Sequence, residues 1–108
     1  MTHPSKRKGN GFERELVNQA VASGIPAKRA YASNGESLGM HAEVDLVVAG
    51  QKIQAKRRKK VPVVFRPSDQ VDATAIREDH GETFVLIRWF DYLDLIKAAQ
   101  SAVDGALD

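Results

Sequence analysis

Two acids, an amide and an amine lie on either side of a short turn in the middle of the chain. Glu43 and Asp45 come before an Ala49-Gly50 dipeptide, and Gln54 and Lys56 come after it. If the dipeptide is the two-residue loop of a β-hairpin, Asp45 lies opposite Gln54, and one step further Glu43 lies opposite Lys56. Because side chains alternate between the faces of a strand, these four share one face. The spacing therefore predicts a polar cluster on a hairpin.

These side-chain types suit hydrolysis of a phosphodiester assisted by a divalent cation. Carboxylates such as Asp45 bind Mg²⁺, and a bound ion polarises the phosphate. Lys56 can stabilise the developing charge or orient the attacking water. Gln54 offers a carbonyl oxygen, a weaker ligand than a carboxylate. The alternative is structural: an acid paired with a surface lysine, and a glutamine that hydrogen-bonds its neighbours.

A further acid, Glu13, has two interpretations. It follows Asn10 by three positions, which nearly matches a capping box with Asn10 as the helix N-cap. A carboxylate in the first helical turn can instead face a site on a sheet. The residues alone leave both interpretations open.

Basic residues are concentrated in the first part of the chain. Residues 1–66 carry 13 Lys/Arg and 5 Asp/Glu, whereas residues 67–108 carry 3 and 9, although the net charge of the whole chain is only +2. The runs 6–8 and 56–60 bracket the polar cluster. This distribution predicts a face that binds nucleic acid through its phosphates, and scattered surface lysines account for only part of it.

The composition is that of a single soluble domain. The chain has 108 residues, of which 43% are hydrophobic and 28% charged, as in ordinary globular proteins. It contains no apolar run long enough to span a membrane, and no secretory signal is expected. The absence of cysteine excludes disulfides and fits a cytoplasmic location. The three histidines lack the spacing of zinc ligands, and no Walker loop, dinucleotide fingerprint or catalytic triad is present.

Residue patterns predict a flexible basic arm over residues 1–8 and one domain over residues 9–108. The expected elements, in order, are a helix (10–23), a strand (27–32), a loop (33–42), the two hairpin strands, an extended segment (61–65), a helix (68–79), a strand (83–89) and a helix capped by Asp91. This order is typical of an α/β fold with a mixed central β-sheet flanked by helices. The very apolar strand 83–89 is expected at the centre of that sheet.

Three motifs make a wider comparison possible: Lys8-Gly9-x-x-x-Glu13-Arg14-Glu15-Leu16-Val17, Val44-Asp45-Leu46-Val47-Val48 and Gln54-Ala55-Lys56. In this order they resemble the archaeal-type Holliday junction resolvases of the PD-(D/E)xK nuclease superfamily, over roughly residues 6–100. Small resolvases of this type also occur in phages. The first motif is the most specific, because the Asp…x-x-Lys portion alone is short.

The resemblance implies a restriction-endonuclease-like core and resolution of four-way junctions in branched DNA by paired symmetric nicks. It also implies Mg²⁺ as cofactor, with Mn²⁺ as a substitute, and a homodimer, since two symmetric cuts need two identical sites. The protein would act in the cytoplasm, on the nucleoid or in a phage-infected host.

Residue by residue, the resemblance makes Glu13 the helical acid of the site and Asp45 its central metal ligand. Lys56 corresponds to the motif lysine. Gln54, the expected third ligand, stands where the family usually has Glu, and the lost charge weakens ion binding unless Glu43 or a water-mediated contact compensates. The expected DNA-binding residues are Lys6, Arg7, Lys8, Arg14, Arg29, Ser33, Arg57, Arg58, Lys59 and Lys60.

Two other functions are compatible with the sequence. The protein could be a nuclease for flaps, nicks or linear ends. It could also be a nuclease-like fold that binds DNA without cleaving it, having lost activity with the Gln54 replacement.

Overall fold

The computed structural model describes residues 4–30, 39 and 41–107, and the chain forms two compact units, residues 1–57 and 58–108. Within the described residues there are two helices and two small antiparallel sheets, one of three strands and one of two. The predicted α/β class is confirmed. The strands seen in these residues do not form the predicted mixed central sheet. No helix in the described part of the chain has the length and apolar character needed to cross a membrane.

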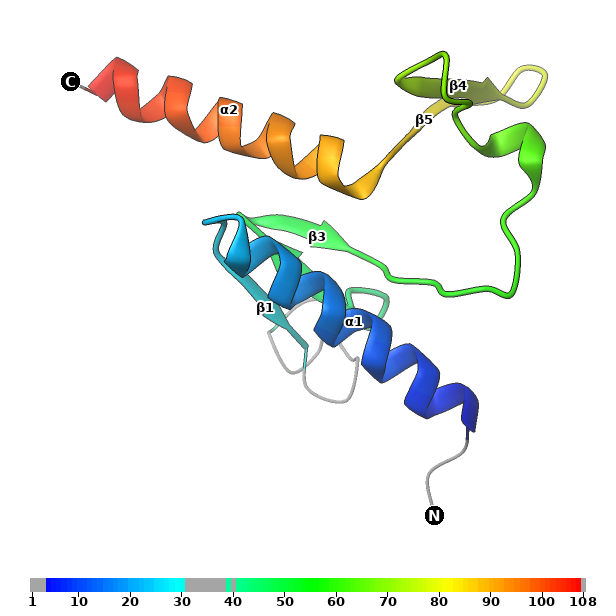
Figure 1. Ribbon diagram of the computed structural model, residues 1–108, viewed down its shortest axis with the longest axis horizontal. Coiled ribbons are helices and arrows are strands. Elements are labelled where there is room, and N and C mark those ends of the chain that lie inside the picture. The colour runs from blue at the N-terminus through cyan, green and yellow to red at the C-terminus, as the bar shows by residue number, and fades with distance from the viewer. Residues whose placement is uncertain (1–3, 31–38, 40, 108) are drawn as a thin grey trace. The chain divides into compact units, whose positions relative to one another are not determined.

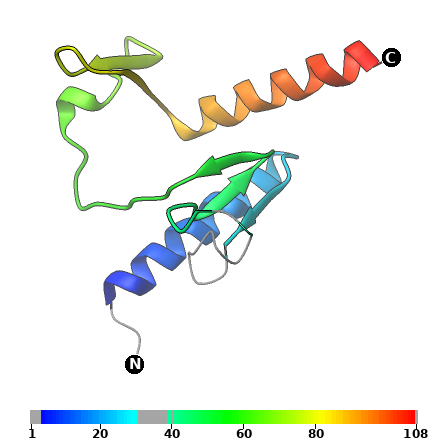
Figure 2. The same ribbon diagram turned by 180° about the vertical axis from the view of Figure 1, so that it is seen from behind.

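In the first unit, one helix lies on one face of the three-stranded sheet. The helix is α1 (Pro4–Ala22), and the strands are β1 (Ala27–Arg29), β2 (Leu46–Val48) and β3 (Gln51–Ile53). The sheet order is β1-β2-β3, with antiparallel neighbours. Figure 1 shows α1 in front of the strands, and Figure 2, drawn from behind, shows the strands in front of α1.

The core of this unit lies between α1 and the sheet. Its buried apolar side chains are Leu16, Ala20, Ile25, Ala30, Val44, Leu46 and Val48. Leu16 and Ala20 lie four positions apart and therefore on one side of the helix. Val21, the next residue, is 55% exposed and lies outside this core. Removing a Leu or Val side chain from water contributes about 1.5–3 kcal/mol, so this layer is the main source of stability of the unit.

The hairpin predicted at Ala49-Gly50 is confirmed. Val48 lies opposite Gln51, so the loop has two residues. Both loop residues have positive φ, 48° at Ala49 and 83° at Gly50. Such values are required at both positions of a type I′ turn, which matches the twist of the strands that it joins. The turn fixes the register, and the register sends Leu46 and Val48 to the helix-covered face.

Helix α1 begins earlier than predicted, at Pro4 instead of after Asn10. Proline is well tolerated in the first turn, where its missing N–H has no helical acceptor. The later start was predicted from Asn10 as the N-cap, a role that the structure does not give it. Residues 4–8 of the predicted basic arm therefore belong to the helix, while residues 1–3 lie outside the described residues.

The second unit contains a hairpin and a long helix. A 3₁₀ turn, η3 (Val63–Phe65), precedes strands β4 (Ala73–Arg77) and β5 (Thr83–Ile87), and α2 (Trp89–Leu107) follows. The 3₁₀ turn lies where extended chain was expected. Helix α2 starts before Asp91, so Asp91 lies in its first turn and is not its cap.

The helix predicted over residues 68–79 is wrong, because residues 73–77 form β4. Thr74 and Ile76 are β-branched and alternate with exposed neighbours, which favours an extended chain. They pair with the apolar strand beyond the turn at His80-Gly81: Ile76 lies opposite Phe84. In the described residues β5 therefore belongs to a two-stranded sheet and is not the centre of a larger one.

Candidate functional site

Glu13 is a buried acid in the body of α1. It is 4% exposed and lies on the same side of the helix as Leu16 and Ala20, three and seven positions further on. Because α1 begins at Pro4, Asn10 is inside the helix and does not cap it. The capping-box interpretation of Glu13 is therefore wrong, and its carboxylate belongs to the layer between α1 and the sheet.

Arg29 of β1 brings a positive charge to Glu13. Its Nη2 lies 3.8 Å from Oε2 of Glu13, and 26% of the Arg29 side chain is exposed. Arg29 lies opposite the fully buried Leu46, so its side chain starts from the helix-covered face of the sheet. Its Nε is buried without a hydrogen-bond acceptor among the described residues. The structure thus places this predicted DNA-binding residue against Glu13.

Asp45 is held by the backbone on both sides. Its carbonyl accepts a hydrogen bond from the N–H of Ala30, and its N–H donates to the carbonyl of Ile53, each at 2.9 Å. The carboxylate Oδ2 accepts from the N–H of Ala55 at 2.7 Å. The short distance is typical of a hydrogen bond to a charged acceptor. The hydrogen bond to Ala55 therefore holds the Asp45 side chain beside the segment that follows β3. It uses Oδ2 and not Oδ1.

Gln54 and Lys56 follow the end of β3. Both are exposed, whereas Ile53 and Ala55 are half-buried, so the alternation of the strand continues to Lys56. The pairing of β2 with β3 ends at Leu46 and Ile53, and beyond it the Asp45 N–H donates to the Ile53 carbonyl. The structure thus brings the Asp45 carboxylate to the backbone of Ala55, next to Gln54, and the contact of Asp45 with the Gln54 side chain stays a prediction.

The turn ahead of Asp45 is closed locally. The Glu43 N–H donates to Nδ1 of His41 at 3.1 Å, and the Val44 N–H donates to the His41 carbonyl at 3.0 Å. His41 and Glu43 are both exposed. Glu43 thus contacts His41 through its backbone N–H.

The oxygen donors of this unit suit a hard cation. Mg²⁺ prefers oxygen ligands, keeps several waters, and commonly uses only one or two carboxylates together with substrate phosphates. Glu13 and Asp45 supply carboxylates, and Gln54 supplies an amide oxygen. No three Asp, Glu or His side chains in the described part of the chain are grouped so that they could hold a metal ion. The described residues therefore do not enclose a cation, and an ion at Asp45 or Glu13 would be bound mainly through water and phosphate.

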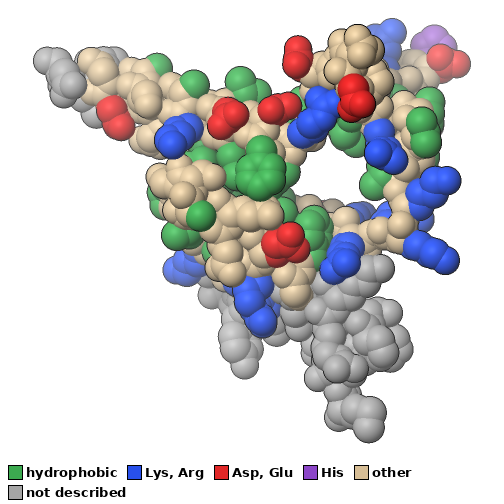
Figure 3. All heavy atoms as spheres, viewed as in Figure 1, with side chains coloured by type: hydrophobic (Ala, Val, Ile, Leu, Met, Phe, Trp, Pro, Cys, Tyr) green, Lys and Arg blue, Asp and Glu red, His purple; other side chains and the backbone are tan. Residues whose placement is uncertain are grey.

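The other predicted DNA-binding residues lie in three places. Arg14 is exposed on α1. The basic run 57–60 is exposed along the segment that leaves β3, where Figure 3 shows blue side chains. The backbone of residues 6–8 belongs to α1, and their side chains, like Ser33, lie outside the described residues.

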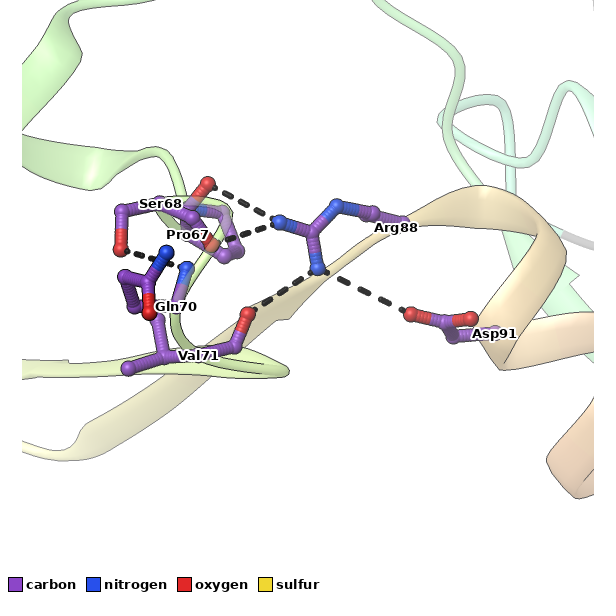
Figure 4. Close-up of polar contacts among 6 residues, drawn as sticks. All are labelled: Pro67, Ser68, Gln70, Val71, Arg88 and Asp91. Atoms are coloured by element: carbon purple, nitrogen blue, oxygen red, sulfur yellow. Dashed lines mark hydrogen bonds and ion pairs between the residues drawn. The ribbon is translucent and has the colours of Figure 1, made fainter.

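Arg88 organises the second unit, although no sequence pattern singled it out (Figure 4). Its Nη1 donates to the Val71 carbonyl at 3.1 Å, and its Nη2 donates to the carbonyls of Pro67 and Ser68 at 3.2 and 2.8 Å. Nη1 also lies 3.9 Å from Oδ2 of Asp91. One guanidinium thus fastens the 67–71 loop to the junction of β5 and α2. A lone arginine after an apolar strand carries no signal of this role.

Comparison of the chain with protein-family models, with curated proteins and with solved structures gives no match.

Proposed function

We propose that this protein is a metal-dependent, structure-selective endonuclease that cleaves branched DNA, with four-way junctions as its substrate. The observation that carries the proposal is the fixed carboxylate of Asp45, which accepts a hydrogen bond from the N–H of Ala55, between Gln54 and Lys56, in the unit that also buries Glu13. A basic run follows the same hairpin directly. Metal ligands next to a surface for phosphates are the parts that phosphodiester hydrolysis requires.

In this proposal Glu13 and Asp45 hold Mg²⁺ or Mn²⁺, and the Gln54 carbonyl assists. When bound, the ion polarises the scissile phosphate. Lys56 orients the attacking water or stabilises the charge that develops on the phosphate. Arg14 and residues 57–60 hold the DNA backbone without reading its sequence, because phosphate contacts carry no sequence information directly.

We also propose that the fold is a variant of the restriction-endonuclease-like core, with a mixed sheet. Its support is the order of the motifs: a helix with a buried acid, then antiparallel strands with Asp45 and the Gln54-Ala55-Lys56 segment. The protein would act on DNA in the cytoplasm, on the nucleoid or in a phage-infected host.

A homodimer is part of the proposal, because paired symmetric cuts need two identical sites. Exposed apolar side chains in the second unit support it: Val64, Phe84 and Val85 are 73%, 61% and 63% exposed. An isolated two-stranded hairpin is marginally stable in water, and apolar side chains on both of its faces favour a covering partner.

A DNA-binding protein without catalytic activity is the second candidate. Two observations favour it: Gln54 replaces the acid usual at this position, and Glu13 faces Arg29 at 3.8 Å. A nuclease for flaps, nicks or ends keeps the same site and differs in substrate alone.

The decisive experiment incubates purified protein with a labelled four-way junction, with and without Mg²⁺, and maps the products on each strand. The proposal expects paired symmetric nicks that require the ion and a preference over flaps and over duplex of equal length. Wild-type cutting by Asp45→Ala protein would rule this site out. Binding without product in both Mg²⁺ and Mn²⁺ across pH would favour the non-catalytic candidate, and Gln54→Glu would then be tested for restored cleavage.

A further inference from the structure

We propose that the DNA backbone lies on the face of the three-stranded sheet that is turned away from α1, and that Lys28 and Lys52 bind its phosphates (Figure 2). The inference rests on the proposed function, because it takes DNA as the partner. It adds two binding residues to that function and names the side of the first unit that the DNA approaches. Both lysines hold the DNA and take no part in the reaction.

Lys28 and Lys52 lie in one row across the sheet. Lys28 of β1 pairs with Val47 of β2, and Val47 pairs with Lys52 of β3. Leu46 and Val48, on either side of Val47, are fully buried on the face that α1 covers, so Val47 and the two lysines face away from α1. Both lysines are exposed. Because neighbouring strands are about 4.8 Å apart, the Cα atoms of the two lysines are roughly 10 Å apart.

The strands of this sheet carry positive charge and no negative charge of their own. The residues of β1, β2 and β3 include Lys28, Arg29 and Lys52 and no Asp or Glu. Arg29 faces Glu13 of α1, which leaves the two lysines for the opposite face. In the part of the chain that the structure describes, neither lysine lies within ion-pair distance of a carboxylate. Two such amines suit the phosphates of a nucleic-acid backbone, which lysine binds as a point charge.

The lysine row lies one step along the sheet from Asp45. Asp45 comes two residues before Val47, so the two residues share a face and are roughly 7 Å apart along the chain. The hydrogen bond from the Asp45 N–H to the Ile53 carbonyl keeps this part of the chain beside β3. The alternation of β3 continues to Lys56, which belongs to the same face. A DNA strand whose scissile phosphate lies at Asp45 therefore places its neighbouring phosphates over the lysine row.

The position of the lysines also has a structural interpretation. Strands β1 and β3 are the two edges of this sheet, and lysines on edge strands discourage pairing with other molecules. With that role alone, replacing Lys28 and Lys52 would promote self-association and leave DNA binding unchanged. A role in binding predicts instead that DNA affinity becomes weaker and less dependent on salt, because fewer counterions are released.

The first test measures affinity for a labelled four-way junction by fluorescence anisotropy between about 50 and 200 mM salt, without Mg²⁺ so that the DNA stays intact. Each lost phosphate contact reduces the slope of log K against log salt by about 0.9. The double variant Lys28→Gln/Lys52→Gln should therefore have a slope shallower by about 1.8 per protomer, which corresponds to about twelvefold over this range. The matched control, Arg77→Gln/Lys97→Gln, removes two charges from exposed positions of the second unit and should keep the wild-type slope.

The possible results separate the inference from the function on which it rests. A wild-type slope in the Lys28→Gln/Lys52→Gln variant, or an equal change in the control, would overturn the inference, while junction cleavage by the wild type would still support the proposed function. A wild-type slope with increased self-association would assign the lysines to protection of the sheet edges. A wild type that neither binds nor cleaves the junction would remove the proposed function, and with it this inference.

The second test uses the wild-type protein, so it does not depend on the folding of a variant. Lysines are acetylated with acetic anhydride in the presence and absence of the junction, and mass spectrometry measures the modification of each one. The DNA should protect Lys28 and Lys52, whereas Lys97 on α2 should react equally in both samples. Equal modification of Lys28 and Lys52 with and without DNA, or equal protection of all three lysines, would overturn the inference.

Discussion

The carboxylate of Asp45 has two separable roles, and two substitutions distinguish them. It accepts a 2.7 Å hydrogen bond from the Ala55 N–H, and in the proposed function it binds the ion. Asn at this position keeps an oxygen acceptor and loses the charge, whereas Ala loses both. We therefore expect Asp45→Asn to preserve the fold and abolish ion binding, and Asp45→Ala to destabilise the hairpin as well.

The magnitude follows from the bond that is lost. A hydrogen bond to a charged group contributes about 1.5–3 kcal/mol. Asp45→Ala removes this bond and leaves the Ala55 N–H unpaired at a half-buried position, so we expect its free energy of unfolding to fall by roughly 2 kcal/mol. Asp45→Asn should lose about 1 kcal/mol, because a neutral acceptor remains. Since 1 kcal/mol shifts Tm by roughly 4–8 °C in a small domain, circular dichroism resolves the two variants.

The assay combines thermal unfolding with Mn²⁺ binding and cleavage of a four-way junction. Asp45→Asn should fold and show neither ion binding nor cleavage. Ion binding at the wild-type level in Asp45→Asn would refute the proposed ligand. Equal Tm values for Asp45→Ala and Asp45→Asn would refute the reasoning about the Ala55 bond and leave the ligand untouched. Lys97→Gln, at an exposed position of α2, is the control for a surface change of charge.

Other perturbations test other parts of the molecule. Ala49→Asn should stabilise the first unit by about 1 kcal/mol, because Asn tolerates the left-handed conformation that Ala49 adopts at φ 48°. Denaturant unfolding measures the change, and a loss of stability would contradict the type I′ turn. Arg88→Ala should expose the 67–71 loop to proteolysis, because the three hydrogen bonds to carbonyls of this loop are lost. The control Arg77→Ala, at an exposed β4 position, should not. Equal proteolysis of the two variants would show that these hydrogen bonds do not hold the loop. DNA affinity should fall by roughly 10³ between 50 and 200 mM salt if about six phosphates are neutralised, and a flat response would contradict the basic face. Gln54→Glu should tighten Mn²⁺ binding by supplying a second charge beside Asp45, and unchanged affinity would place residue 54 outside the site.

Local pattern was sufficient for the central hairpin. The Ala49-Gly50 loop sets the register, and the alternation of Val44, Leu46 and Val48 sends these side chains to the core. Both signals act between residues close in sequence, so they can be read without the fold. The same pattern predicted that Gln54 lies beside Asp45.

Tertiary structure decided what the acid of the first helix does. The sequence allowed two interpretations of Glu13, as part of a capping box or as a site residue. The start of α1 at Pro4 excludes the capping box. The approach of Arg29 to Glu13 depends on how α1 packs on β1, and no local spacing reports it. The same holds for Arg88, whose acceptors lie 17 to 21 positions earlier in the chain.

The second unit shows why short-range patterns fail where pairing is long-range. Residues 73–77 carry polar and small side chains compatible with a helix, and β4 forms because Ile76 and its neighbours pair with the apolar strand β5 across a turn. A strand gains its hydrogen bonds from another segment, whereas a helix makes its own. The sequence alone therefore determined the chemistry available at the hairpin, and only the tertiary structure decided which charges face one another in the interior.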